Sequence, residues 1–325
     1  MTSRTIRRGQ FYALAAMAIW STNYILGRSL RDTLTPATIS TVRAIMAGIP
    51  LATWVGARGE WPHPLRPFLG PFLGLGFLGI FASQYLTYLA LHWSLATNVI
   101  ILNAGSPLVT AALAVAAGVT PFSARLFGGL ALSVAGAALV TALGASGGTR
   151  VQLDPGALLV VASMVTWGLY NLGVQRLSRS LPPLAITSGS MVAGLPFLLA
   201  ALWIERPAQV WVSVWRNFPT LVYLALGPSA VAYACWSAAI RDLGAGYAML
   251  FNNTLPVFGM VLGAVILHEP VTIVQVLASA LIIGGIMVGF RSLALEVHTP
   301  PSGGSPGSRK SVGTPEEGPG RWGRA

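Results

Sequence analysis

The chain has 325 residues, of which 54% are hydrophobic and only 9% charged, whereas a typical soluble domain carries about 25% charged residues. So apolar a chain cannot bury its surface in one aqueous core, and its length leaves room for about ten helical spans of roughly 20 residues each. The net charge of +11 could indicate nucleic-acid binding, but the basic residues stand singly between apolar runs, without a basic stripe or motif. We therefore expect no nucleic-acid partner.

Ten apolar runs follow one another along the chain, separated by short connectors that carry most of the charges. The first run resembles a signal peptide, but it has no small-residue cleavage pattern and many more spans follow, so we expect a retained helix. After residue 295 the composition turns to proline, glycine, serine and charge, which predicts a disordered tail over 296–325. The predicted spans are 11–27, 36–56, 68–91, 97–118, 124–144, 156–175, 184–204, 218–240, 247–267 and 271–290.

The charges of the connectors predict how the chain crosses the membrane. Alternating the connectors between two sides places fourteen basic residues on the side of the N-terminus and five on the other, with Arg43 left inside a span. Cytoplasmic connectors are enriched in lysine and arginine. We therefore expect a multi-pass protein of the cell membrane with an even number of spans, both termini in the cytoplasm and the tail cytoplasmic.

The second half of the chain repeats features of the first. Each half holds five predicted spans, an odd number, so the second half enters the membrane from the opposite side. The sequence therefore predicts an all-α membrane protein of ten transmembrane helices, arranged as two inverted five-helix repeats over 10–145 and 154–291. The coinciding pairs include Asn103/Asn252 and Pro107/Pro256 at a shift of 149 residues, and Met17/Met164 and Trp20/Trp167 at a shift of 147.

The fourth and ninth predicted spans each carry an asparagine four residues before a proline. Proline lacks an amide hydrogen and frees the carbonyl four residues earlier, here that of Asn103 or Asn252. Inverted-repeat carriers bind substrate near the midplane at such interrupted helices. We predict that Asn103 and Asn252 bind substrate and that Pro107 and Pro256 are hinges. The alternative is that the prolines only kink the helices while the asparagines bond neighbouring helices.

Arg43 is the one basic residue well inside a predicted span, where a charge is costly and indicates function. Two roles are open at this stage for an inward guanidinium: it binds an anionic group of the substrate, or it organises a polar cavity. A third alternative is structural, because Arg43 lies seven residues beyond Pro36 and its long side chain could reach the outer interface.

Aromatic and polar side chains recur at helical spacing in the first, third, sixth and eighth predicted spans, and can line one face of a cavity. An interfacial aromatic belt is the alternative, and we prefer it for Trp54, Trp61, Trp203, Trp211 and Trp215. The predicted substrate-binding residues of the inner group are Trp20, Asn23, Gln84, Tyr88, Trp167, Tyr170 and Tyr233, with Tyr24, Tyr85, Asn171, Trp236 and Ser237 beside them.

Other chemistry finds no support in the sequence. None of the nine acidic residues lies near the centre of a predicted span, so we expect no buried carboxylate relay for protons. No nucleophile triad, metal-ligand cluster or phosphate-binding loop appears, which predicts neither an enzyme nor a metal or other cofactor. The pairs Gly70/Gly74 and Gly285/Gly289 have a spacing that permits close helix contact. We expect them to pack the bundle, in a monomer or a homodimer.

With these features the sequence resembles the drug/metabolite transporter superfamily and, within it, the EamA-type ten-span carriers. The likeness covers about 10–291. One departure is Thr120 before Pro121, where family members often have glutamate, while the second half keeps Glu269 before Pro270. The residues that carry the resemblance are Ala18, Ile19 and Trp20, Arg43 and Ala44, Asn103 and Pro107, Trp167, Asn252 and Pro256, and His268, Glu269 and Pro270.

The resemblance implies two four-helix groups around a central cavity, with the fifth and tenth spans at the periphery. It also implies alternating-access movement of a small metabolite, commonly export of an amino acid or a related compound. We therefore expect a secondary transporter of the bacterial inner membrane whose partners are a small-molecule metabolite and the lipid bilayer. A membrane-embedded lipid scramblase or enzyme is the alternative.

Overall fold

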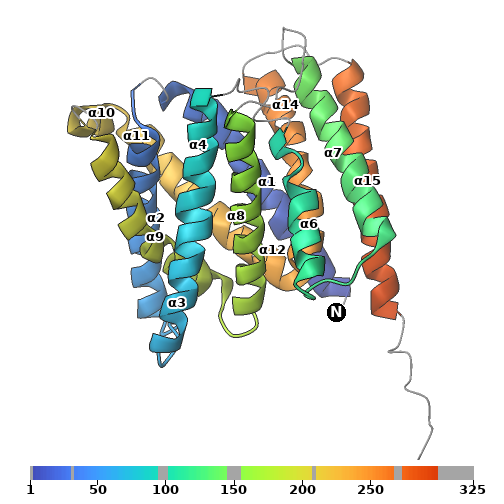
Figure 1. Cartoon of the computed structure of the whole chain (residues 1–325), viewed down its shortest axis with the longest axis horizontal. Helices are drawn as coiled ribbons and strands as arrows, with labels where there is room; N and C mark the ends of the chain where they lie inside the picture. The colour runs from blue at the N-terminus through green and yellow to red at the C-terminus, as the bar shows by residue number, and fades with distance from the viewer. Residues whose placement is uncertain are drawn as a thin grey trace, which may run out of the picture.

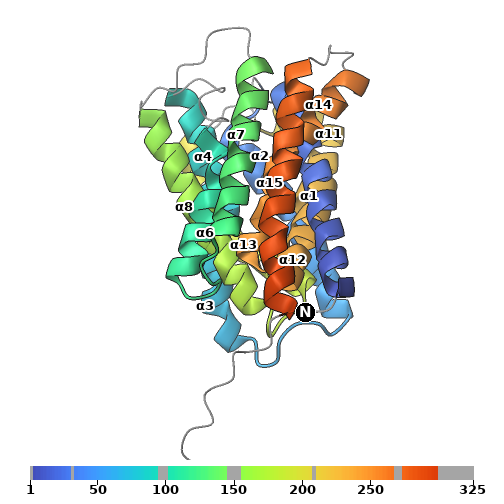
Figure 2. The same ribbon diagram turned by 90° about the vertical axis from the view of Figure 1, so that its right-hand side faces the viewer.

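A computed structural model describes residues 3–30, 33–93, 102–144, 155–206, 210–266 and 273–298. Within that part of the chain every regular element is helical, and most of the helices stand side by side along one common direction (Figures 1 and 2). The N-terminus lies at the lower end of this bundle in both views, and the end that holds it is called the N-terminal face below.

The first half of the bundle contains a helix that changes its geometry without ending. The segments α3, η1 and α4 follow one another directly, and η1 is a π-helix of seven residues. The helix before this segment, α2, is capped by Thr35, whose side chain accepts a hydrogen bond from the backbone N–H of Thr38. Pro36 fills the first position of α2. The elements are α1 (Ser3–Leu30), α2 (Pro36–Ala57), α3 (Arg66–Leu75), η1 (Gly76–Ala82), α4 (Ser83–Trp93), α6 (Ser106–Ala116) and α7 (Ala124–Gly144).

The second half contains a matching π-helical segment and a further break. The π-helix η2 lies between α11 and α12, and the 3₁₀-helix η3 lies between α13 and α14. The elements are α8 (Pro155–Leu177), α9 (Pro183–Glu205), α10 (Val210–Arg216), α11 (Phe218–Leu224), η2 (Ala225–Val231), α12 (Ala232–Leu243), α13 (Ala245–Ala248), η3 (Met249–Thr254), α14 (Leu255–Ile266) and α15 (Ile273–His298).

The bounds of these elements recur at the spacing found in the sequence. The two π-helices begin at Gly76 and Ala225, 149 residues apart, and both are seven residues long. The starts of α6 and α14, and those of α7 and α15, are also 149 residues apart. π-Helical segments are rare, so their recurrence at one place in each half does not follow from an apolar composition alone.

Contacts between the helices also come in matching pairs. The helix α1 packs on α12 as α4 packs on α8, and α2 packs on η2 as α9 packs on η1. Two further contacts join corresponding elements, α2 with α9 and α7 with α15. The pair α7 and α15 stands at one edge of the bundle (Figures 1 and 2), in the peripheral position that the family resemblance implies for the fifth and tenth spans.

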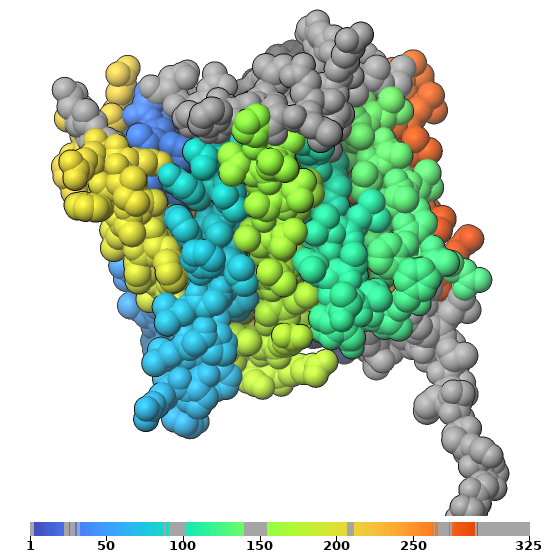
Figure 3. All heavy atoms as spheres, viewed as in Figure 1, coloured from blue at the N-terminus to red at the C-terminus, as the bar shows by residue number. Residues whose placement is uncertain are grey.

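Five segments of the described residues are long and apolar enough to cross a membrane: Pro36–Ala57, Arg66–Thr87, Pro155–Leu177, Pro183–Glu205 and Phe218–Leu243. Shorter apolar helices are Ser106–Ala116, Ala124–Leu139 and Gln275–Gly289. From the front, η1 with α4, α8 and α6 with α7 form a continuous surface (Figure 3). The start of the predicted span 97–118 and residues 299–325 of the predicted tail lie outside the described residues, while α15 continues through His298.

Glycines let α7 and α15 approach at backbone distance. A Cβ atom at Gly285 would lie 2.5 Å from the carbonyl oxygen of Gly129, and one at Gly289 would lie 2.6 Å from the side chain of Leu250. The prediction that Gly285 and Gly289 pack the bundle is therefore confirmed. For Gly70 and Gly74 it is wrong, because no atom lies within 4 Å of a Cβ placed at either residue.

The α7–α15 contact gives a direct test of this packing. We expect Gly285→Ala to lower the free energy of unfolding by about 1–3 kcal/mol, because the added methyl group overpacks the contact. Gly284→Ala is the matched control, since its Cβ would meet only Leu132 at 4.0 Å and alanine favours the helix. Thermal unfolding of the purified protein measures both. Equal loss of stability in the two variants would contradict the close contact.

Candidate substrate-binding centre

Five aromatic rings from three helices meet inside the bundle. They are referred to as the ring cluster and comprise Trp20 of α1, Trp167 and Tyr170 of α8, and Tyr233 and Trp236 of α12. The centroid of the Trp20 ring lies 5.9 Å from Trp167, 5.3 Å from Tyr233 and 5.6 Å from Trp236. These separations suit edge-to-face and offset ring pairs. The cluster therefore joins the first half of the chain to the second through direct contacts.

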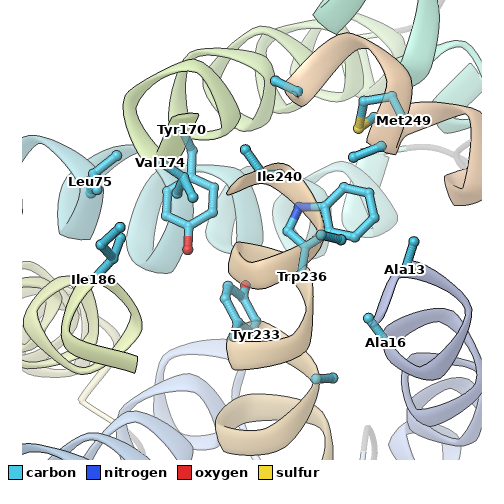
Figure 4. Packing of buried hydrophobic residues seen from close by; sticks show 14 of the residues in the cluster. Ala13, Ala16, Leu75, Tyr170, Val174, Ile186, Tyr233, Trp236, Ile240 and Met249 are labelled. Atoms are coloured by element: carbon cyan, nitrogen blue, oxygen red, sulfur yellow. The ribbon is translucent and has the colours of Figure 1, made fainter. Parts of the chain in front are cut away.

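Burial differs among the five rings. Tyr170 and Trp236 are fully buried, and Tyr233 is nearly so, whereas Trp20 and Trp167 are half-buried. In the close view, Tyr170, Tyr233 and Trp236 lie among side chains that include Ala13 and Ala16 of α1, Leu75 of α3 and Ile186 of α9 (Figure 4). The glycine at position 79 makes room for Tyr170, because a Cβ atom there would overlap its ring. Tyr170 is thus a packed wall of the cluster, and Trp20 and Trp167 are its more accessible members.

Polar groups at the edges of the rings fix the orientation of the cluster. The indole N–H of Trp20 donates to the carbonyl of Pro228 at 2.8 Å, and that of Trp236 donates to Oδ1 of Asn171 at 2.9 Å. The side-chain amide of Gln84 donates to the Tyr233 hydroxyl at 3.2 Å. A buried indole or phenol normally finds such a partner. The structure therefore brings Trp20, Gln84, Trp167, Tyr170 and Tyr233 of the predicted site together.

Arg43 lies against the same π-helix that holds Trp20. Its Nε donates to the hydroxyl of Ser229 at 3.0 Å, and that hydroxyl in turn donates to the carbonyl of Leu224 at 3.0 Å. Ser229 is buried. The guanidinium is thus turned towards η2 within the bundle, which argues against the alternative that it extends to the outer interface.

At each of the two Asn-Pro elements the α-helix is interrupted, as predicted, but the proline is not the cause of the interruption. Pro107 and Pro256 are the second residues of α6 and α14, where a missing amide hydrogen costs little. The α-helical geometry is interrupted before each proline, by a turn at residues 104–105 in the first half and by the 3₁₀-helix η3 in the second. The carbonyl of Asn252 is not released, contrary to expectation, because it accepts from the backbone of Leu255. The side chains of Asn103 and Asn252 are half-buried, and their role in binding stays a prediction.

Several other predicted residues lie elsewhere. The side chains of Asn23 and Tyr88 fall outside the described residues. The expectation for Tyr85 is wrong, since its ring stacks on Phe81 beside Phe197 in a groove away from the cluster. Trp61 is half-buried and donates to the carbonyl of Ala52 at 3.1 Å, so it is not part of an exposed belt. The remaining belt residues are exposed, namely Trp54, Trp203, Trp211 and Trp215.

An ion pair between an exposed arginine and a buried carboxylate, at the N-terminal face, was missed by the sequence analysis. Asp242, near the end of α12, accepts from Nε of Arg8 at 2.7 Å and from its second terminal nitrogen at 3.0 Å. Arg241 adds a contact of 2.9 Å, and the carboxylate side chain is only 2% exposed. The two-pronged contact with Arg8 joins α1 to α12. Arg8 and Asp242 stand near the ends of predicted spans, where sequence alone indicates solvated residues.

Two halves of the chain match one family model separately. The model describes the EamA-like transporter family and matches residues 7–142 and again 154–291. The chain belongs to this family. It is therefore a membrane transporter, as the resemblance stated above predicts.

Curated relatives of the chain are bacterial proteins. An uncharacterized transporter of Bacillus subtilis, YyaM, is 24% identical over 75% of this chain and 80% of its own. A probable amino-acid metabolite efflux pump of Salmonella typhimurium is 24% identical over 88% and 96% of the two chains. An uncharacterized inner membrane transporter of Escherichia coli, YedA, is 24% identical over 86% and 89%. One solved crystal structure matches with a TM-score of 0.73 and 19% identity, covering 92% of this chain and 100% of that one.

The Arg8–Asp242 pair gives a test of how α1 is held on α12. We expect Arg8→Gln to lower the melting temperature, because it leaves a buried carboxylate facing Arg241 alone. Arg4→Gln is the matched control, since Arg4 is exposed and loses the same charge. The double variant Arg8→Gln/Asp242→Asn should lose less than the sum of the single losses. Equal decreases in melting temperature for Arg4→Gln and Arg8→Gln would show that the loss of net charge causes the effect. That result would contradict a stabilising role of the Arg8–Asp242 pair.

Proposed function

We propose that the chain is a secondary carrier that exports a small metabolite, an amino acid or a related compound, by alternating access to the ring cluster. The observation that carries the proposal is that this cluster lies where both halves of the chain meet, through Trp20 of α1 and Trp167 of α8. Aromatic walls with a few oriented polar groups are the usual lining of a small-molecule site. Relatives in Salmonella and Escherichia coli carry names as amino-acid metabolite efflux pumps.

The proposed architecture is ten spans in two inverted repeats, over 10–145 and 154–291. Two contacts support an axis of pseudo-symmetry through the ring cluster. Trp20 contacts Trp167, its counterpart at a spacing of 147, and Gln84 bonds to Tyr233, its counterpart at a spacing of 149. In a two-fold arrangement a residue reaches its own counterpart only beside the axis. Carriers of this kind hold their substrate at that interface.

Alternating access requires that the two faces open in turn. The Arg8–Asp242 pair closes α1 against α12 at the N-terminal face. Just beside it, the side chain of Gln175 in α8 accepts from the backbone of Ala245 at 2.8 Å. We propose that this conformer is closed at the N-terminal face, which the positive-inside count assigns to the cytoplasm, and that transport breaks these contacts.

The charges favour facilitated transport or exchange over obligate proton symport. Asp242 is the buried acid among the described residues, and it stands at the end of α12 with two arginine partners that keep it ionised. Proton-coupled carriers use carboxylates inside the bundle that gain and lose protons during transport. No acid of this chain lies near the centre of a predicted span.

A lipid scramblase is the less favoured function for the same bundle. It requires a hydrophilic groove open to lipid, along which a headgroup can move. The groove at α4 and α9 is instead lined by Phe81, Tyr85, Phe197, Ala200, Ala201 and Ile204. Such a lining offers a headgroup almost no polar partner.

Reconstituted protein tests the proposal. A thermal-shift screen with the twenty standard L-amino acids selects a ligand, and its uptake into liposomes is then measured with and without a pH gradient. We expect uptake without a gradient, and a loss of about tenfold or more in Trp20→Ala and Trp167→Ala, each of which removes a wall of the site. Trp54→Ala is the matched control, because Trp54 is exposed.

Each outcome of this experiment bears on a separate part of the proposal. Normal uptake by the Trp20 and Trp167 variants, with Trp54→Ala unchanged, would contradict the ring cluster as the site. Strictly gradient-dependent accumulation would contradict facilitated transport. Asn103→Ala and Asn252→Ala test the paired asparagines in the same assay, and normal uptake by both would remove them from the site.

A further inference from the structure

Arg43 occupies a position where a cation needs a partner. It is the eighth residue of α2, and a rise of about 1.5 Å per residue places it about 10 Å beyond the start of that helix. The apolar core of a bilayer is about 30 Å thick, so this depth lies well inside it. A guanidinium in such a place is stable only when polar or anionic groups surround it.

The protein satisfies one edge of this guanidinium. Ser229 accepts from Nε, and because its own proton is committed to the Leu224 carbonyl, it faces Arg43 as an acceptor. The ion pairs recorded among the described residues are Arg8–Asp242, Arg58–Glu60 and Arg241–Asp242, and none includes Arg43. Arginine carries five N–H donors in a planar fork. Within the described part of the chain its terminal nitrogens therefore have no acidic partner, and this fork matches a planar oxyanion with two oxygens.

The Arg43 guanidinium lies beside the ring cluster. Ser229 follows Pro228 directly in η2, and the carbonyl of Pro228 holds the indole of Trp20. Two consecutive residues of the π-helix η2 thus orient the indole of Trp20 and the guanidinium of Arg43.

The cation occurs in one half of the chain only. At the spacing of 147 the counterpart of Arg43 is Ser190, whose hydroxyl donates to the carbonyl of Ile186 at 2.7 Å. At the spacing of 149 the counterpart of Ser229 is Ile80. The pair of Arg43 and Ser229 is therefore not repeated at the corresponding positions of the other half, which suits a substrate with one anionic end.

We propose that Arg43, positioned by Ser229, binds the carboxylate of the transported metabolite. This inference rests on the proposed transport function and names the side chain that recognises the anionic group of the substrate. It assigns Ser229 a positioning role through the hydroxyl that accepts from Arg43.

Paired probes test this assignment. Competition for uptake into liposomes compares each standard L-amino acid with its C-terminal amide, which keeps the side chain and removes the negative charge. We expect wild-type protein to prefer the acid by about tenfold or more, as a charge-assisted bidentate contact implies, and Arg43→Gln to lose that preference. Ser229→Ala should reduce it by a smaller factor. Arg58→Gln is the control, because Arg58 is exposed and pairs with Glu60 beyond the end of α2.

The outcomes separate this inference from the transport proposal. Uptake of an amino acid by wild-type protein with an equal response to its amide would overturn the role of Arg43 and leave transport standing. Retained preference in Arg43→Gln would do the same. Absence of uptake for every amino acid would overturn the proposed function and the inference with it. If Arg43→Gln does not fold, Arg43→Lys keeps the charge without the fork, and it should show a reduced preference at unchanged stability.

Discussion

Inside a bilayer every backbone N–H and C=O must find its partner within the protein, and this constraint explains where the helices of this chain depart from α geometry. The π-helix η1 is covered by α8 and α9, and η2 is covered by α1 and α2. The 3₁₀ segment η3 lies against α1, α6, α7 and α15. Irregular backbone thus lies where other helices contact it, and one of these segments, η2, supplies the groups that bond to Trp20 and Arg43.

The constraint links backbone geometry to the site. Because η2 is covered rather than exposed, its turn at Pro228 and Ser229 can present one carbonyl to Trp20 and one hydroxyl to Arg43. A regular α-helix would bond that carbonyl to its own chain four residues later. The orientation of Trp20 and Arg43 therefore depends on helix irregularity as well as on side-chain identity. Two charged features have no counterpart at the spacing of the repeat, Arg43 with Ser229 in the bundle and Arg8 with Asp242 at one face.

Much of the fold could be predicted from the sequence, because long apolar runs and the recurrence of Asn103 and Pro107 as Asn252 and Pro256 are properties of composition and order. The contacts of Trp20, Trp167, Gln84 and Tyr233 followed from helical spacing together with the repeat. The π-helices could not be predicted, since their sequences are as apolar as the α-helices around them. The Arg8–Asp242 pair was missed because residues 234 positions apart meet only through tertiary packing. Pro107 and Pro256 were predicted to be hinges that free the carbonyls of Asn103 and Asn252, whereas they are the second residues of α6 and α14 and the break lies just before them.

The proposed carrier requires that the two halves have opposite orientations in the membrane. Arg66 begins α3, before η1, and Arg216 ends α10, just before α11 and η2; both residues are exposed. Single cysteines at these two positions, in a Cys235→Ala background, can be labelled in intact cells with a membrane-impermeant maleimide. We expect labelling of Arg216→Cys from outside, and labelling of Arg66→Cys only after the membrane is permeabilised. Labelling of both from the same side would contradict the inverted repeat and the carrier built on it.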